Sequence, residues 1–180
     1  MKIIIDAGHG PNTPGKRSPD GKLREFQFNS AVAQEVKKRL VLDGHTVIFS
    51  HQEDRDVPLL ERTRLANRMG ADLFLSIHAN AFGNAFNSAN GIETFTYYKS
   101  SGESNRLAAF VQNALVLSTG RKNRGIKHAD FAVLRDTAMP AILIECGFMT
   151  NREEAQLLKS SSYRRDCARA IVFGIGCYAL

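Results

Sequence analysis

The sequence predicts a single α/β domain with a largely parallel sheet. Short apolar or β-branched runs alternate along the chain with segments of helical periodicity, a pattern typical of parallel sheets flanked by helices. The chain has 180 residues, 43% of them hydrophobic and 23% charged, which fits one globular domain whose core needs no disulfide or structural metal. Because no repeat or linker divides the sequence, we expect residues 1–180 to form one domain.

The first half of the chain predicts three strands and two helices. We expect strands at 2–6, 46–49 and 72–77 and helices at 25–42 and 58–69. The first helix carries an apolar stripe at the spacing of one helix face: Phe28, Val32, Val36 and Leu40. Gly44 ends that helix, and Pro58 is suited to the first turn of the next one. A loop rich in Gly and Pro joins the first strand to the first helix.

The second half continues the alternation of strands and helices. We expect strands at 92–98 and 140–145 and helices at 104–117, 153–158 and 163–178. The segment 80–90 contains Gly, Asn and Ser and predicts an exposed loop, and 119–130 predicts a basic loop.

Cysteines and apolar runs indicate the compartment in which the chain is made. The three cysteines, at 146, 167 and 177, show no CxxC spacing and stand in apolar surroundings, so we expect buried free thiols. The longest apolar stretch, 170–180, is too short to span a bilayer, and we expect no membrane insertion. Asp6 interrupts the first apolar run after three isoleucines, so we expect synthesis in the cytoplasm without a signal peptide.

The net charge suggests an anionic partner. The chain has 24 Lys and Arg against 18 Asp and Glu, a formal charge of +6, which suits nucleic acid, a membrane surface or an acidic wall polymer. The basic residues are dispersed and form no tail. Neither a GxxxxGK[ST] loop nor a Rossmann fingerprint occurs in the sequence. We therefore expect no nucleotide chemistry and no nucleic-acid partner.

Polar residues lie at the carboxyl ends of three predicted strands, where an apolar strand has no structural need of them. They are His9, His78 and Glu145. Ligands of open α/β sheets bind outside the carboxyl ends of the strands. If these three strands are parallel neighbours, the three side chains converge at one edge of the sheet. Gly8 and Gly10 beside His9 would let the backbone turn sharply and approach a ligand.

Glu25 is a fourth candidate because it extends the apolar stripe of the first helix by one turn, which predicts an inward orientation. Two imidazoles and one carboxylate, from His9, His78 and Glu25, form a suitable zinc set with a fourth position open for water. Glu145 would then be placed where a general base belongs.

Each candidate also has a structural interpretation. Glu25 could be a first-turn acid that the helix dipole favours. His9 could be a loop histidine bonded to backbone, and His78 a buried histidine with its hydrogen bonds satisfied. Glu145 could cap a helix or form an ion pair near 150–152. The remaining histidines, at 45, 51 and 128, predict structural or exposed positions, although the loop around His128 could line the cleft and contact substrate.

The chain resembles the zinc-dependent N-acetylmuramoyl-L-alanine amidases of the amidase-3 type along nearly its whole length. The motifs that carry the resemblance are, in order, 6–10 (DAGHG), Glu25 with Asn29, 60–62 (LER) with 66–67 (AN), 76–80 (SIHAN), 91–94 (GIET), 124–127 (RGIK) and 139–151 (MPAILIECGFMTN). The resemblance implies a mixed sheet of about six strands flanked by helices. It also implies zinc held by His9, Glu25 and His78, with Glu145 as the catalytic acid.

The implied substrate is peptidoglycan, cleaved at the amide between the lactyl group of N-acetylmuramic acid and L-alanine. A phage endolysin, a bacterial autolysin active in mother-cell lysis and an excised catalytic domain all fit the sequence. Each would reach the cell wall after release or lysis, and a monomer is favoured. A zinc peptidase that cuts elsewhere in the stem peptide and a non-catalytic wall-binding domain are the rival interpretations. No residue of the sequence is assigned to substrate binding.

Overall fold

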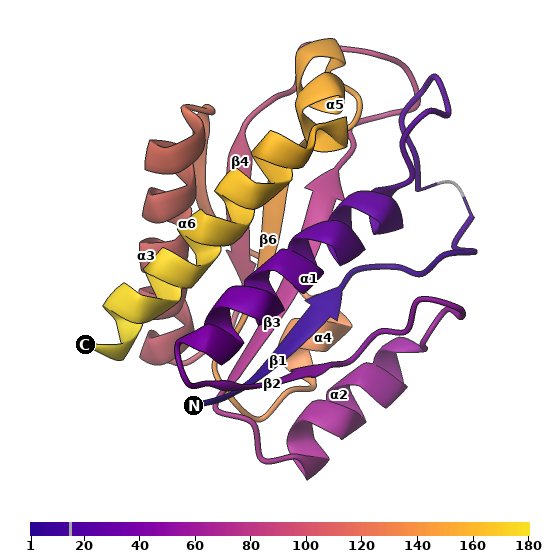
Figure 1. The fold of residues 1–180 in the computed structure, drawn as a ribbon. Coiled ribbons are helices and arrows are strands. Elements are labelled where there is room, and N and C mark those ends of the chain that lie inside the picture. Colours follow the sequence, from indigo (N-terminus) through magenta and orange to yellow (C-terminus); the bar gives the residue numbers. More distant parts are fainter. Residues whose placement is uncertain (15) are drawn as a thin grey trace.

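A mixed sheet forms the centre of the molecule in the computed structural model, which describes residues 1–14 and 16–180 (Figure 1). Its six strands in the described residues have the order β2-β1-β3-β6-β4-β5. The strands are β1 (Lys2–Ala7), β2 (Thr46–Phe49), β3 (Leu73–Asn80), β4 (Ile92–Thr96), β5 (Asn123–His128) and β6 (Ala141–Phe148). The helices are α1 (Glu25–Leu42), α2 (Leu59–Arg68), α3 (Gly102–Thr119), α4 (Ala132–Arg135), α5 (Arg152–Lys159) and α6 (Ser161–Ala179). The predicted α/β class and mixed, mostly parallel sheet are confirmed.

Strand direction brings the carboxyl ends of three neighbouring strands to one edge. β1 pairs in parallel with β3, and β3 pairs in parallel with β6, while β4 is antiparallel to β6. The register places Asp6 opposite Ser76 and His78 opposite Glu145. The predicted convergence is therefore present, although β3 and β6 both continue a few residues past the polar side chain.

Helices cover both faces of the sheet. A large apolar core lies between the sheet and α1, α3 and α6, and the predicted stripe of α1 is fully buried in it. A smaller core lies on the opposite face, where Ala66 of α2 and Val133 and Leu134 of α4 pack on the sheet. Two of the three cysteines, Cys146 and Cys167, are buried free thiols as expected, whereas Cys177 is partly exposed.

The segment 119–130 is a correction to the sequence prediction. It contains β5, which pairs in parallel with β4 at the edge of the sheet. Its residues are basic and mostly half-buried or exposed, so the apolar run that predicts a strand is missing. Charged side chains are usual on an edge strand. The one-turn helix α4 was not predicted either. In the part of the chain that the structure describes, no helix is long and apolar enough to cross a membrane.

Candidate active site and metal centre

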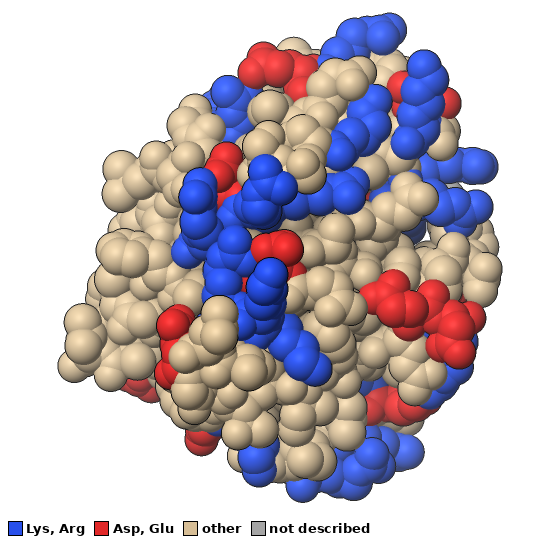
Figure 2. Space-filling view, viewed as in Figure 1, with Lys and Arg blue, Asp and Glu red and all other residues tan. Residues whose placement is uncertain are grey.

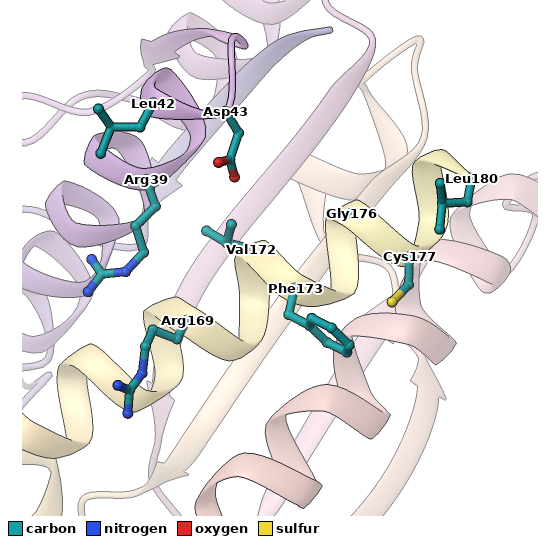
Figure 3. A pocket seen from close by; sticks show the side chains of 9 residues that line it. All are labelled: Arg39, Leu42, Asp43, Arg169, Val172, Phe173, Gly176, Cys177 and Leu180. Carbon is teal, nitrogen blue, oxygen red and sulfur yellow. The ribbon is translucent and has the colours of Figure 1, made fainter.

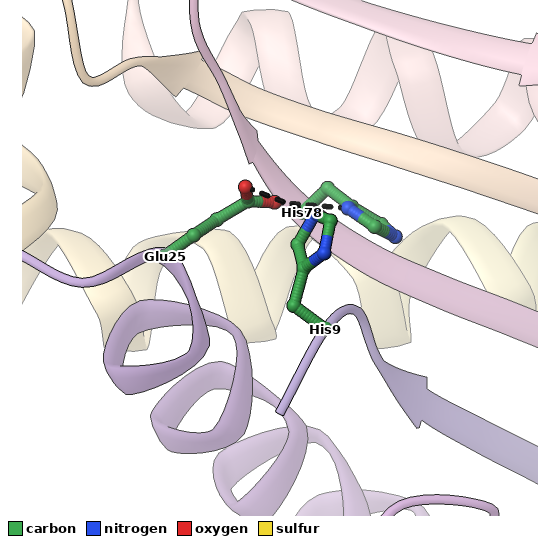
Figure 4. Close-up of side chains that lie close together, drawn as sticks. All are labelled: His9, Glu25 and His78. Atoms are coloured by element: carbon green, nitrogen blue, oxygen red, sulfur yellow. Dashed lines mark hydrogen bonds and ion pairs between the residues drawn. The ribbon is translucent and has the colours of Figure 1, made fainter. Parts of the chain in front are cut away.

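His9, Glu25 and His78 come together from three different elements. His9 lies two residues after the end of β1, Glu25 is the first residue of α1, and His78 lies in β3. Glu25 Oε2 is 3.1 Å from His9 Nε2, and Glu25 Oε1 is 2.9 Å from His78 Nδ1 (Figure 4). One donor atom from each of the three residues lies within 4.8 Å of the others. This arrangement is compact enough for all three residues to ligate one metal ion.

Glu25 points inward, as the stripe on α1 predicts. The residue is only 4% exposed, and its Oε1 also accepts hydrogen bonds from Asn29 Nδ2 and the Ala79 backbone N–H, both at 3.3 Å. Burial opposes ionisation, but the interactions with the His78 and His9 rings hold the pKa of Glu25 well below its usual range. These contacts of Glu25 go beyond an interaction with the helix dipole.

The backbone around His9 is folded tightly to bring its ring to the cluster. Among the described residues other than glycine, His9 alone has a positive φ, of 64°. A Cβ on Gly8 would lie 2.0 Å from Cε1 of His78, so this position requires glycine. A Cβ on Gly10 would lie 2.2 Å from Oδ1 of Asp56. The glycines therefore make room for protein side chains, which differs from the predicted approach to a ligand.

A buried ion pair beneath the cluster holds this loop in place. Arg62 of α2, 2% exposed, donates to Asp6 Oδ1 at 2.8 Å, to the carbonyl oxygen of Ala7 at 2.7 Å and to that of His9. Burial opposes the charge on Asp6, but Arg62 and two serine hydroxyls lower its pKa. Both residues lie in motifs of the sequence, but 56 positions separate them, so the sequence alone does not predict that they pair.

Glu145 lies beside the cluster with an unused oxygen. Its Oε2 atom is buried and has no hydrogen-bond partner among the described residues. Burial and the nearby carboxylates of Glu25 and Glu93 raise the pKa of Glu145 to about 8. Glu145 does not cap the following helix. Asn151 caps α5, because its side chain accepts hydrogen bonds from the backbone N–H groups of Glu153 and Glu154. Glu145 is thus positioned to hold a proton next to the cluster.

A cavity of about 480 Å³ opens over these residues. His9, His78 and Glu145 form part of its floor. Its other lining residues are Asp6, Gly8, Thr13, Lys16, Asp56, Val57, Pro58, Leu59, Arg62, Phe131, Val133 and Leu143. The mixture of apolar and polar side chains suits a substrate with both kinds of group. The sequence predicts His9, His78 and Glu145 at this site, and only the fold brings most of the other lining residues to it.

A second hollow, of about 530 Å³, lies between the carboxyl-terminal parts of α1 and α6 (Figure 3). Arg39, Arg169 and Phe173 are among its lining side chains. Arg39 is about 21 Å from Glu25 along the axis of α1, so this hollow is separate from the cluster.

The other histidines occupy structural or exposed positions, as predicted. His51 is buried, and its Nδ1 accepts from the Ala7 backbone N–H at 3.0 Å. His45 is half-buried, and its Nδ1 lies 3.2 Å from the amino terminus. His128 lies on β5, where its Nδ1 is 2.9 Å from Thr96 Oγ1, and it is not among the residues that line the cavity in the described chain.

Comparison with known proteins agrees with the fold and defines the family. The chain belongs to the Amidase_3 family, described as N-acetylmuramoyl-L-alanine amidase, whose family model matches residues 3–177. The resemblance found in the sequence motifs is therefore confirmed.

Individual relatives share most of this chain. YqiI of Bacillus subtilis, an uncharacterized protein, is 39% identical over 98% of this chain and 84% of its own length. The N-acetylmuramoyl-L-alanine amidase LytC of the same organism is 38% identical over 98% of this chain, which spans 35% of LytC. The crystal structure of an N-acetylmuramoyl-L-alanine amidase from Clostridium difficile 630 superposes with a TM-score of 0.94 at 37% identity, covering 99% of this chain and 96% of that one.

Proposed function

We propose that this chain is a zinc-dependent hydrolase that cleaves the amide between the lactyl group of N-acetylmuramic acid and L-alanine in peptidoglycan. The observation that carries the proposal is the cluster of His9, Glu25 and His78 beside a cavity that His9, His78 and Glu145 line. Within the described residues, Glu145 Oε2 has no hydrogen-bond partner. Membership of the amidase family supports the choice of bond.

The donor set fits zinc. Nitrogen atoms of His9 and His78 and an oxygen of Glu25 would hold the ion, and zinc in hydrolytic enzymes commonly takes three such ligands and keeps one position open. When bound, zinc lowers the pKa of water and polarises a carbonyl oxygen. The three side chains already face one another, so little rearrangement of the chain is needed.

Glu145 would carry the proton during hydrolysis. A cation bound at the cluster would favour the ionised form of Glu145. Its Oε2 would then accept a proton from the attacking water and return it to the nitrogen of L-alanine as the carbon–nitrogen bond breaks. The products are the lactyl carboxylate and a free amine, so the reaction consumes one water and leaves Glu145 unchanged. Without the returned proton, the amide nitrogen would be a very poor leaving group.

The site of action follows from the substrate. We infer that the protein acts on the cell wall after release from the cytoplasm or after mother-cell lysis, as an endolysin or an autolysin does. A monomer suffices, because all four proposed functional residues belong to one chain.

Mass spectrometry of the fragments released from purified peptidoglycan tests the proposal. We expect new amino-terminal L-alanine and intact N-acetylmuramic acid with a free lactyl carboxylate. Chelator should abolish the reaction and added zinc restore it. Cleavage at another bond of the stem peptide would assign the protein to a different peptidase activity, and binding without cleavage would make it a wall-binding domain.

A further inference from the structure

A chain of hydrogen bonds connects the proposed ligand His78 to the interior of the sheet. Asp6 and Ser76 are register partners in β1 and β3, and Ser76 lies two residues before His78, so their side chains share one face of the sheet. Ser76 Oγ donates to Asp6 Oδ2 at 2.6 Å and lies 3.0 Å from His78 Nε2. Both Asp6 and Ser76 are essentially inaccessible to solvent.

The charge on Asp6 fixes the direction of these hydrogen bonds. Its Oδ1 accepts from Arg62 at 2.8 Å and from Ser50 Oγ at 2.7 Å, so Asp6 is an ionised carboxylate that can only accept. The single hydroxyl proton of Ser76 is therefore used toward Asp6. Ser76 Oγ must then accept from His78, which requires a proton on His78 Nε2.

This assignment determines the other nitrogen of the ring. In a neutral imidazole only one nitrogen carries a proton, so the lone pair of His78 is at Nδ1. That nitrogen lies 2.9 Å from Glu25 Oε1, which is also an acceptor. Two acceptors this close need a cation shared between them, either a proton on Nδ1 or a metal ion that replaces it.

We propose that Ser76 is a positioning residue that, anchored by Asp6, holds His78 as its Nε2–H tautomer and directs Nδ1 to the metal. The inference rests on the proposed zinc site. It adds that Nδ1 is the nitrogen of His78 that ligates zinc and that Ser76 selects this nitrogen. Partners behind ligating histidines commonly change metal affinity by about 10–100-fold when they are removed.

Zinc affinity measured by competition with a chromophoric chelator tests the role of Ser76. Ser76→Ala should weaken zinc binding by about 10–100-fold. Ser50→Ala is the matched control, because Ser50 donates to the same carboxylate but does not contact His78, and its zinc affinity should stay near that of the unsubstituted chain. Equal affinities for Ser76→Ala and the unsubstituted chain, or equal losses in both variants, would overturn the proposal.

Nitrogen NMR of the zinc-loaded, unsubstituted protein is a second test that needs no variant to fold. His78 should show a protonated Nε2 and a metal-bound Nδ1. A protonated Nδ1 with Nε2 bound to zinc would overturn the inference while leaving the zinc hydrolase intact. Failure of the unsubstituted chain to bind zinc would instead overturn both, so the two failures can be told apart.

Discussion

Single residues set the geometry of the proposed metal centre. Gly8 shows this most directly, because the His78 ring occupies the space that a side chain at position 8 would need. The neighbouring residue His9 accepts a positive φ, and a backbone conformation of this kind costs of order 1–3 kcal/mol unless the surroundings hold it. We therefore expect stability and the proposed metal binding to depend on the same few positions.

We expect Gly8→Ala to displace the His78 ring and to weaken zinc binding by at least about tenfold, with a loss of stability of about 1–3 kcal/mol from overpacking. Gly176→Ala is the matched control, because a Cβ there meets nothing within 4 Å. Alanine in that helix should be neutral or stabilising. Zinc competition and urea unfolding of the two variants are the measurements, and unchanged zinc affinity in Gly8→Ala would contradict the account.

The raised pKa of Glu145 predicts a pH-dependent stability in the metal-free protein. Its pKa is about 8 in the folded chain, against about 4.3 for an unfolded glutamate, so the folded state binds this proton more tightly. Protonated Glu145 should therefore contribute fully to the free energy of unfolding below about pH 4, and this contribution should be lost as the pH rises to about 8. Between these values the free energy of unfolding should fall by at most about 1.4 kcal/mol per pH unit.

Chelator-treated protein and its Glu145→Gln variant, unfolded in urea from pH 4 to 9, measure this contribution. The variant cannot ionise, so its stability relative to the unsubstituted chain should rise across that range. Parallel pH profiles for the two proteins would show that burial does not raise the pKa of Glu145.

Secondary-structure elements act on the site through their connections. The helix α2 contacts the loop after β1 by way of Arg62, whose guanidinium reaches two backbone carbonyls and Asp6. A lysine keeps the charge but cannot reproduce this set of hydrogen bonds. The position of His9 therefore depends on an element outside the proposed ligand set.

We expect Arg62→Lys to weaken zinc binding by about tenfold and to lower the melting temperature, because the His9 carbonyl loses its anchor. Arg64→Lys is the control, since Arg64 is an exposed residue of the same helix. Equal zinc affinities for the two variants would mean that α2 does not position His9.

The elements also show how far sequence reasoning reaches. Residues 25–42 form the predicted helix because a long stripe of apolar side chains determines its face, and the same stripe predicts that Glu25 points inward. The strand β5 lacks such a signal because it gains its hydrogen bonds from β4 at an exposed edge. Arg62 and Asp6 are 56 residues apart in sequence, and only the fold brings them together.

Basic side chains gather on one face of the molecule. Lys and Arg side chains gather on the face that carries α1 and α6 (Figure 2). Lys38, Arg39 and Arg165 lie near enough to Glu35 to act on its charge. With the formal charge of +6, this face would attract an anionic cell wall over a range set by salt.

Lysis of whole cell walls should fall as salt rises through physiological concentrations, whereas hydrolysis of a small soluble muropeptide should change much less. Screening limits attraction between exposed charges to about 8 Å at physiological salt, and the small substrate depends little on long-range attraction. Replacing Lys38 and Arg165 together by Gln should lower wall lysis at low salt without changing muropeptide turnover. The same salt dependence for both substrates would exclude a role for surface charge.

The most direct test of the whole account is the zinc content and turnover of Glu145→Gln and Glu25→Gln, measured side by side with the unsubstituted protein. We predict that Glu145→Gln keeps about one zinc per chain and loses roughly 10²–10⁴ in turnover, because only proton transfer is removed. Glu25→Gln should lose zinc and activity together. The reverse pattern would exchange the two roles, and turnover by Glu145→Gln at the rate of the unsubstituted chain would contradict the proposed mechanism.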